Sequence, residues 1–224
     1  LSIQGFATVA IDHPRHGERG IDVGDDGTDD FNATTGSVLS YMNLSSLLVA
    51  RDSLRQSAAD LLGLRLGLNF INDTTINSKD VTYIGHSLGS IVAPAFIAQA
   101  NTPMAETLDP LFNVNTVALA SGGGGIASFL LESAAFGPFI QGSVLSQAGT
   151  TEADEFTAYL QGDAVSNCGS LIPDMEAYLT CGYSEYIASL TTAGETTKLT
   201  NIQGVFTQFA FAAQTALDSG DPTT

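Results

Sequence analysis

A glycine-flanked serine near the middle of the chain has the sequence context of a nucleophile. Ser87 lies in the pentapeptide Gly85-His86-Ser87-Leu88-Gly89, between a strand-like and a helix-like run. The two glycines permit a sharp strand-to-helix turn that exposes the serine hydroxyl. The backbone N–H of Leu88 would then lie at the helix N-terminus, where amides stabilise a developing oxyanion. The pattern predicts Ser87 as a catalytic nucleophile for acyl transfer, with Leu88 as an oxyanion donor.

A serine nucleophile needs a neighbouring base, and the histidines of the chain are His13, His16 and His86. We expect His86 to pack within the elbow and to point away from Ser87. His13 and His16 follow an apolar run, at a sheet edge where the active sites of α/β proteins gather. We interpret them as candidate pocket residues. Two other interpretations stay open for this pair, a substitute base and a solvated loop.

Charged side chains gather at two further places. Carboxylate oxygens bind calcium, but five aspartates near residue 25 do not have the spacing of the standard calcium loop, so we expect a solvated acidic turn. The sequence predicts no metal site and no cofactor. Three charged residues on a predicted helix are expected to form ion pairs. The aspartates are Asp22, Asp25, Asp26, Asp29 and Asp30, and the helix residues are Arg51, Asp52 and Arg55.

Two cysteines, Cys168 and Cys181, lie close together in the sequence. An even number fits one local disulfide in a secreted protein. Two free buried thiols fit the count equally well.

Residues 1–125 alternate between strand-like and helix-like segments. Continuous apolar runs are typical of strands buried on both faces of a parallel sheet, and apolar residues at helical spacing predict helices. The alternation predicts an α/β fold, a parallel sheet with flanking helices. The strands are expected over 5–11, 81–84 and 115–120, and the helices over 44–68, capped by Asn43, and over 90–100, with a polar loop over 12–32.

Four consecutive glycines, Gly122–Gly125, separate this part from a second region, residues 126–224. The second region lacks convincing strands, and we interpret it as a helical cap or lid over the sheet. Its helices are expected over 126–136, 152–161, 175–190 and 205–217, with turn chemistry over 218–224.

The elbow resembles that of the α/β hydrolases. Further segments resemble one branch, the bacterial extracellular lipases and phospholipases known as virulence-factor lipases. Together they cover residues 1 to about 140 and are moderately specific. The matching segments are Val9-Ala10-Ile11-Asp12-His13-Pro14-Arg15-His16-Gly17, Arg51-Asp52-Ser53-Leu54-Arg55-Gln56 with Asp60-Leu61, Gly85 to Gly89, and Gly122 to Gly125 followed by Leu131-Glu132-Ser133 and Phe136-Gly137-Pro138.

The resemblance implies a serine carboxylic ester hydrolase, a lipase, esterase or lysophospholipase, that forms an acyl-enzyme on Ser87. In this superfamily the triad runs Ser, then Asp or Glu, then His, and no histidine follows Ser87 in the chain. The acid and the histidine are therefore expected outside these residues, the chain being an internal fragment that is inactive alone. A non-catalytic binding or adhesion module is the alternative, and a peptidase or thioesterase on the same scaffold stays open.

Apolar side chains in the second region favour a lipid-like ester as substrate. An ordinary helical core explains each of them as well. They are Phe129, Leu130, Leu131, Phe136, Phe139, Ile140, Phe206, Phe209 and Phe211.

The overall charge excludes some classes of partner. A formal net charge of -17 and a pI near 4.1 cannot neutralise a phosphate backbone, so nucleic acid is not expected as a partner. No apolar run is long enough for a membrane helix. The acidity and the scarcity of lysine favour secretion, and we expect an extracellular or outer-surface location in a bacterium.

Overall fold

The computed structural model describes residues 1–222 and is a mixed α/β protein that is mainly helical, with 59% of its residues in helices. The chain forms two compact units. The first comprises Leu1–Gly124 together with the residues from Leu217 on, and the second comprises Gly125–Ala216. The end of the predicted turn over 218–224, Thr223 and Thr224, lies outside the described residues.

The sheet of the first unit has two parallel strands, β1 (Thr82–His86) and β2 (Thr116–Ala120). Their register runs from Thr82 opposite Thr116 to His86 opposite Ala120. Both strands lie where the sequence predicts them. The predicted burial of the strand over 115–120 is wrong, because every residue of β2 is exposed although α2 packs against the sheet.

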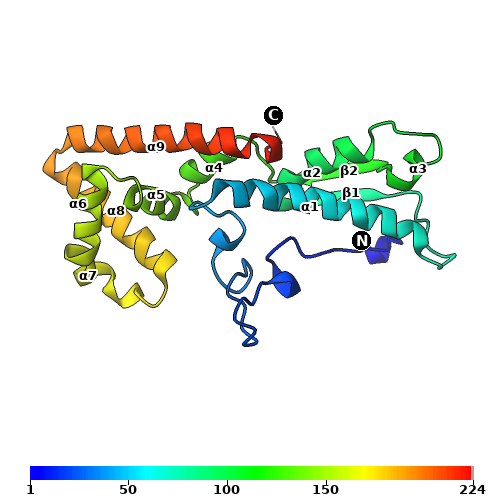
Figure 1. The fold of residues 1–224 in the computed structure, drawn as a ribbon, viewed down its shortest axis with the longest axis horizontal. Helices are drawn as coiled ribbons and strands as arrows, with labels where there is room; N and C mark the ends of the chain where they lie inside the picture. The colour runs from blue at the N-terminus through cyan, green and yellow to red at the C-terminus, as the bar shows by residue number, and fades with distance from the viewer. Residues whose placement is uncertain (223–224) are drawn as a thin grey trace. The chain divides into compact units, whose positions relative to one another are not determined.

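Two long helices pack on each other beside the strands (Figure 1). Helix α1 (Leu47–Gly67) and helix α2 (Leu88–Ala100) share a core that includes Leu54, Val92 and Phe96. Asn43 does not cap α1. Its side chain instead accepts a hydrogen bond from Ser46 N at 2.8 Å in a turn before the helix. A short helix α3 (Asp109–Phe112) precedes β2, and single 3-10 turns form at Ser2–Gln4, Gly17–Arg19, Val38–Ser40, Leu68–Phe70 and Asp218–Gly220.

The predicted strand over 5–11 is wrong. Residues 6–13 have no regular secondary structure, and Phe6 and Val9 are more than half exposed. A strand is defined by hydrogen bonds to a neighbour, and within residues 1–222 no strand pairs with this segment. The segment is apolar, as a buried strand would be, but an apolar composition does not supply the neighbouring strand to which a strand must hydrogen-bond.

The second unit consists of helices joined by short loops, without strands in its described residues. Predicted helices over 152–161 and 175–190 are confirmed. The helix predicted over 205–217 forms but begins earlier, at Thr196, and the one predicted over 126–136 ends early, at Glu132. Two further helices were not expected. The six helices are α4 (Ile126–Glu132), α5 (Gly137–Ser146), α6 (Thr151–Gln161), α7 (Asp163–Cys168), α8 (Met175–Ala193) and α9 (Thr196–Leu217), with a 3-10 turn at Gly169–Leu171.

Glycines allow close helix packing in this unit. A Cβ at Gly142 of α5 would lie 3.2 Å from Tyr183 Cβ and 3.3 Å from the carbonyl oxygen of Leu179, both on α8. Gly182 of α8 faces the side chain of Leu160 on α6 in the same way. Aromatic rings fill the core between these helices, at Phe156, Tyr183, Tyr186 and Phe206.

Candidate functional site

Ser87 joins β1 directly to α2, as the sequence predicts for an elbow. Its backbone has φ 50 and ψ -116, a conformation that non-glycine residues rarely adopt. The Ser87 N–H donates to the carbonyl oxygen of Ala120 at 3.0 Å, and the Ser87 carbonyl accepts from Ser90 N at 2.8 Å and Ile91 N at 3.1 Å. The residue is exposed. The strained turn thus presents a serine at the carboxyl end of the sheet.

The two glycines of the elbow have different steric roles. A Cβ at Gly85 would lie 2.7 Å from the carbonyl oxygen of Gly89 and 2.8 Å from its carbon, closer than real Cβ atoms approach backbone. A Cβ at Gly89 would meet only the hydroxyl of Tyr83, at 3.5 Å, which is ordinary contact. That hydroxyl donates to the carbonyl of Gly89 at 2.7 Å. The sequence pattern suggested that both glycines are required, whereas the structure requires only Gly85.

Leu88 is the first residue of α2. The N–H groups of a helix's first turn have no acceptor within the helix and carry its positive dipole end. Leu88 therefore has the position that an oxyanion donor needs. His86 is the last residue of β1, opposite Ala120. It is exposed, so the expectation that it packs within the elbow is wrong.

Ser90, which the sequence motif does not include, connects the elbow to the second strand through hydrogen bonds. Its buried Oγ lies 2.7 Å from the carbonyl oxygen of Gly85 and 2.8 Å from that of Ala120, and it accepts a hydrogen bond from Ala120 N at 3.1 Å. A Cβ at Gly122 would lie 2.7 Å from Ser90 Cβ. A small polar residue three positions after the nucleophile, within the apolar first half of α2, was the available signal.

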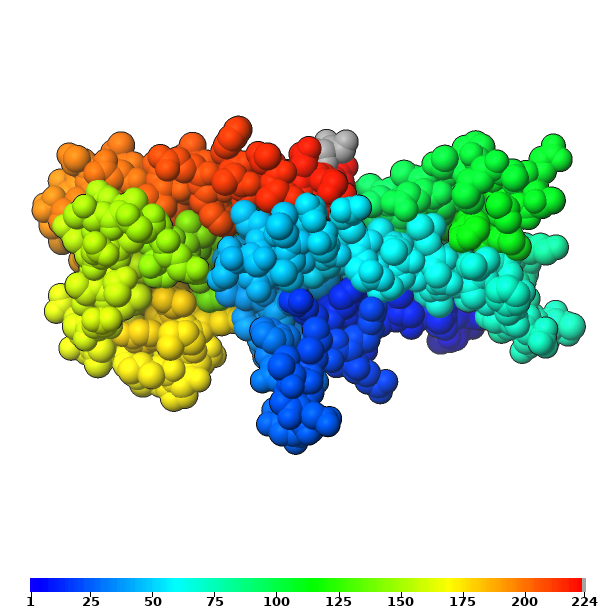
Figure 2. All heavy atoms as spheres, viewed as in Figure 1, coloured from blue at the N-terminus to red at the C-terminus, as the bar shows by residue number. Residues whose placement is uncertain are grey.

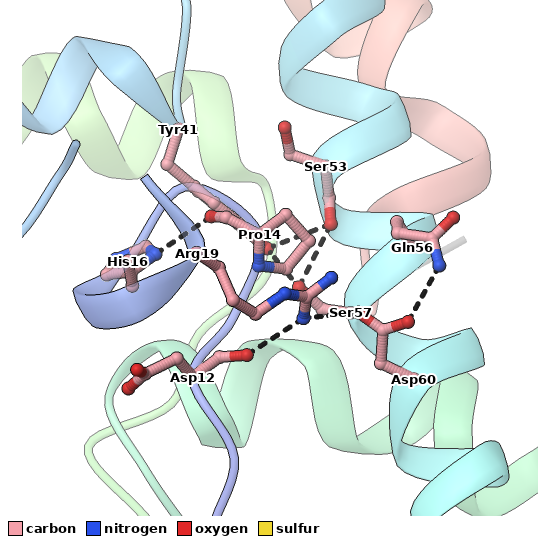
Figure 3. Close-up of polar contacts among 9 residues, drawn as sticks. All are labelled: Asp12, Pro14, His16, Arg19, Tyr41, Ser53, Gln56, Ser57 and Asp60. Carbon is pink, nitrogen blue, oxygen red and sulfur yellow. Dashed lines mark hydrogen bonds and ion pairs between the residues drawn. The ribbon is translucent and has the colours of Figure 1, made fainter. Parts of the chain in front are cut away.

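The loop that carries His13 and His16 packs against Tyr41. The ring centroids of His16 and Tyr41 are 5.1 Å apart, and those of His13 and Tyr41 are 6.4 Å apart. His16 Nδ1 lies 3.0 Å from the carbonyl oxygen of Pro14 (Figure 3). His13 Nδ1 is buried and has no hydrogen-bond partner among residues 1–222. Burial, and then the charges of His16 and Arg19, lower the pKa of His13.

Polar contacts fix this loop to helix α1 (Figure 3). Arg19 Nη1 donates to Asp60 at 2.6 Å and to the carbonyl of Asp12 at 2.8 Å. The Tyr41 hydroxyl is 2.8 Å from Ser57 Oγ on α1. No hydrogen bond or ring contact in the described part of the chain joins His13 or His16 to Ser87. The structure therefore brings the two histidines together with each other and with Tyr41, next to α1.

The aspartates between residues 22 and 30 bind their own backbone. Asp22 accepts from Gly27 N at 2.7 Å and from Asp26 N at 3.3 Å, and Asp30 accepts from Val23 N at 2.7 Å. The hydrogen bond from Gly27 is the main cause of a lowered pKa at Asp22. Over residues 1–222, no group of three or more His, Cys, Asp or Glu side chains is arranged to hold a metal ion. In Figure 2 this turn is the blue projection of the first unit.

Helix α1 carries the predicted ion pairs. Arg51 Nε lies 2.8 Å from Asp52 Oδ1, and Arg55 Nη1 lies 3.8 Å from the same oxygen. All three side chains are at the surface, so they contribute little to stability.

In the second unit, a disulfide joins Cys168 to Cys181, with their Cα atoms 5.9 Å apart. It links the end of α7 to α8 beside a small core that contains Ala164 and Tyr178. The apolar residues proposed as a substrate surface divide into two groups. Leu131, Phe139, Ile140 and Phe206 are buried in the core, and Phe129, Phe136 and Phe211 are exposed. Leu130 and Phe209, which belong to neither group, are half-buried.

Within residues 1–222, no helix is both long and apolar enough to cross a membrane. Comparison of the chain with models of protein families, with curated proteins and with solved structures finds no match.

Proposed function

We propose that the chain carries the nucleophile elbow of a serine carboxylic ester hydrolase of the α/β-hydrolase type. One observation carries the proposal: Ser87, an exposed non-glycine residue, has φ 50 between a parallel strand and a helix. Strain of this kind is kept where the surrounding structure imposes it, and it gathers at functional sites. A strained strand-to-helix turn is also the feature that makes the serine of a G-x-S-x-G motif accessible.

In the proposed reaction, Ser87 Oγ attacks the carbonyl carbon of an ester while a base takes its proton. Negative charge on the former carbonyl oxygen is stabilised by the N–H of Leu88. The bond to the alcohol oxygen then breaks, and the alcohol leaves with the proton returned by the base. Water releases the acid from the acylated serine in a second cycle of the same steps.

The resemblance implies that the base and its acid partner follow the nucleophile along the chain. His13 and His16 lie against α1 with Tyr41, without contact to Ser87 in the described residues, and His86 precedes the serine. The proposal therefore assigns the base and its acid partner to none of the residues of this chain.

A lipid-like ester is the substrate class that the proposal favours. Its support is the resemblance of the elbow and the other matching segments to the extracellular lipases and phospholipases. A disulfide supports an extracellular location, because disulfides persist in oxidising compartments. A preference for acetyl over long-chain p-nitrophenyl esters in a chain-length series would contradict the lipid part alone.

The test is covalent labelling of Ser87 in the natural protein that contains this chain. A fluorophosphonate probe should label the peptide with Ser87, and Ser87→Ala should abolish labelling. Ser170→Ala, which changes an exposed serine of the second unit, is the matched control and should label as the wild type does. A folded wild-type protein that takes up no probe at Ser87 would contradict the hydrolase and favour a non-catalytic binding module.

A further inference from the structure

A second strained serine lies at the same end of the sheet as Ser87. Ser121 follows β2 directly and has φ 55, although it is not a glycine. It is exposed. Among residues 1–222, neither the Ser121 hydroxyl nor the Ser87 hydroxyl has a hydrogen-bond partner. Two adjacent parallel strands therefore end in two exposed serines with left-handed φ.

The conformation of Ser121 is imposed by its neighbours. Ala120 is held on one side, because its carbonyl accepts from Ser87 N at 3.0 Å and its N–H donates to Ser90 Oγ at 3.1 Å. Gly122 is held on the other side, because its Cα hydrogens face Ser90, where a Cβ would lie 2.7 Å from Ser90 Cβ. The chain must turn between these two fixed residues, and glycine would make this turn without strain.

Ser121 follows the sheet at the same register position as Ser87. His86 pairs with Ala120, so Ser87 and Ser121 are the next residues of the two strands. Parallel strands end at one edge, and both serines leave the sheet there. A serine at a position that favours glycine keeps a hydroxyl at a cost in stability, which is the pattern expected of a functional side chain.

We propose that Ser121 is a specificity-determining residue that donates a hydrogen bond to an oxygen of the ester bound at Ser87. This inference rests on the proposed function. It predicts that Ser121→Gly raises stability while it lowers activity. Ser121→Gly removes the strain and the hydroxyl, whereas Ser121→Ala keeps the strained backbone and removes only the hydroxyl.

The experiment compares these variants with the wild type and with Asp25→Gly in the natural protein. Asp25 also has a left-handed φ, 50, but lies in the acidic turn, so its glycine variant controls for relief of strain elsewhere. For each protein we would measure the midpoint of urea unfolding, kcat/KM for p-nitrophenyl butyrate and the rate of fluorophosphonate labelling of Ser87.

We expect Ser121→Gly and Asp25→Gly to unfold at higher urea concentration than the wild type. Both Ser121 variants should lose about fivefold in kcat/KM, the effect of one neutral hydrogen bond, whereas Asp25→Gly should keep the wild-type value. Partial unfolding cannot explain a loss of kcat/KM in a variant that is more stable than the wild type, so such a loss would be due to the missing hydroxyl. Unchanged kcat/KM in both Ser121 variants would overturn this inference. If Ser87 were still labelled in those variants, the proposed function would stand. An inert wild type would overturn both.

Discussion

At the scale of single residues, the two glycines of the elbow differ in whether the structure has room for a methyl group at each position. Gly85→Ala places a Cβ 2.7 Å from the backbone of Gly89, so the turn must shift. We expect a loss of about 1–3 kcal/mol in the free energy of unfolding and no labelling of Ser87.

Gly89→Ala is the control. It lies in α2 with free space for a methyl group, and it should stabilise the protein by about 0.5–1 kcal/mol. Urea unfolding would measure both changes, and a fully labelled Gly85→Ala variant would contradict the steric argument.

His13 makes the stability of the first unit depend on pH. Burial lowers its pKa in the folded state below the ordinary 6.5, His16 and Arg19 act in the same direction, and Asp60 and Asp12 oppose them. The unfolded chain therefore binds the proton more tightly, so this contribution is complete above pH 6.5 and is lost as the pH falls from 6.5 through the lowered pKa. Urea unfolding at pH 7.5 and 5.0 should show a smaller acid-induced loss for His13→Gln than for the wild type. Equal losses in the two proteins would contradict this assignment.

Sequence patterns identified Ser87, the exposed serine of the elbow, but not Ser90 and Ser121, which lie beside it in the structure. Gly85, Ser87 and Leu88 were found because motif and flanking elements agree locally. Ser90 and Ser121 were missed, because their roles depend on the register between β1 and β2, and residues that distant in the sequence have no common local pattern. His13 and His16 were predicted near a sheet edge, but the strand that would place them there does not form.

At the scale of elements, Arg65 of α1 holds the turn that leads from α3 into β2. The side chain is 2% exposed, and it donates from Nε to the carbonyl of Asn113 at 2.8 Å and from Nη2 to that of Pro110 at 3.1 Å. Arg65→Ala leaves these carbonyls without donors and opens a cavity, so we expect a loss of about 2–4 kcal/mol. Burial lowers the pKa of Arg65, which means that its charge is costly there. Arg65→Met should therefore lose less than Arg65→Ala in urea unfolding, and a larger loss for Met would contradict this account.

The disulfide stabilises the junction of α7 and α8 in the second unit. Cys168 and Cys181 are 13 positions apart, and closing a loop of that length reduces the entropy of the unfolded chain by an amount worth about 3 kcal/mol. Reduction, or the double variant Cys168→Ala/Cys181→Ala, should destabilise the second unit by about this amount in urea unfolding monitored by tyrosine fluorescence. A reductant should leave the double variant unchanged. An effect of reductant on that variant would show that something other than this bond is responsible.

Local periodicity predicted most helices and both paired strands, and its failures have physical causes. Helix α5 was missed because Gly137, Pro138 and Gly142 are breakers when judged by propensity alone. In the structure Pro138 occupies the first turn, where its missing N–H costs nothing, and Gly142 permits close packing on α8. Residues 6–11 show the opposite case, since apolar composition predicted a strand that has no pairing partner within the described residues.

At the scale of the whole molecule, the charge imbalance is the dominant property. The chain has 24 acidic and 7 basic side chains, and in residues 126–224 the single basic side chain, Lys198, is paired with Glu155 at 2.7 Å. Exposed carboxylates in such excess repel one another in the folded state more than in the expanded one. They also keep a protein soluble in concentrated salt, which is consistent with the proposed extracellular location.

This imbalance predicts that salt stabilises the protein. Raising NaCl from 20 to 500 mM shortens the Debye length from about 20 Å to about 4 Å, which screens repulsion between distant carboxylates more than attraction within close pairs such as Arg19 and Asp60 at 2.6 Å. We expect the free energy of unfolding to rise by about 1 kcal/mol, a shift of about 2–4 °C in Tm. KCl at the same concentrations should act equally, because screening does not depend on the identity of the cation. A Tm that falls with salt would mean that the ion pairs outweigh the repulsion, and a rise with only one cation would indicate specific binding in place of screening.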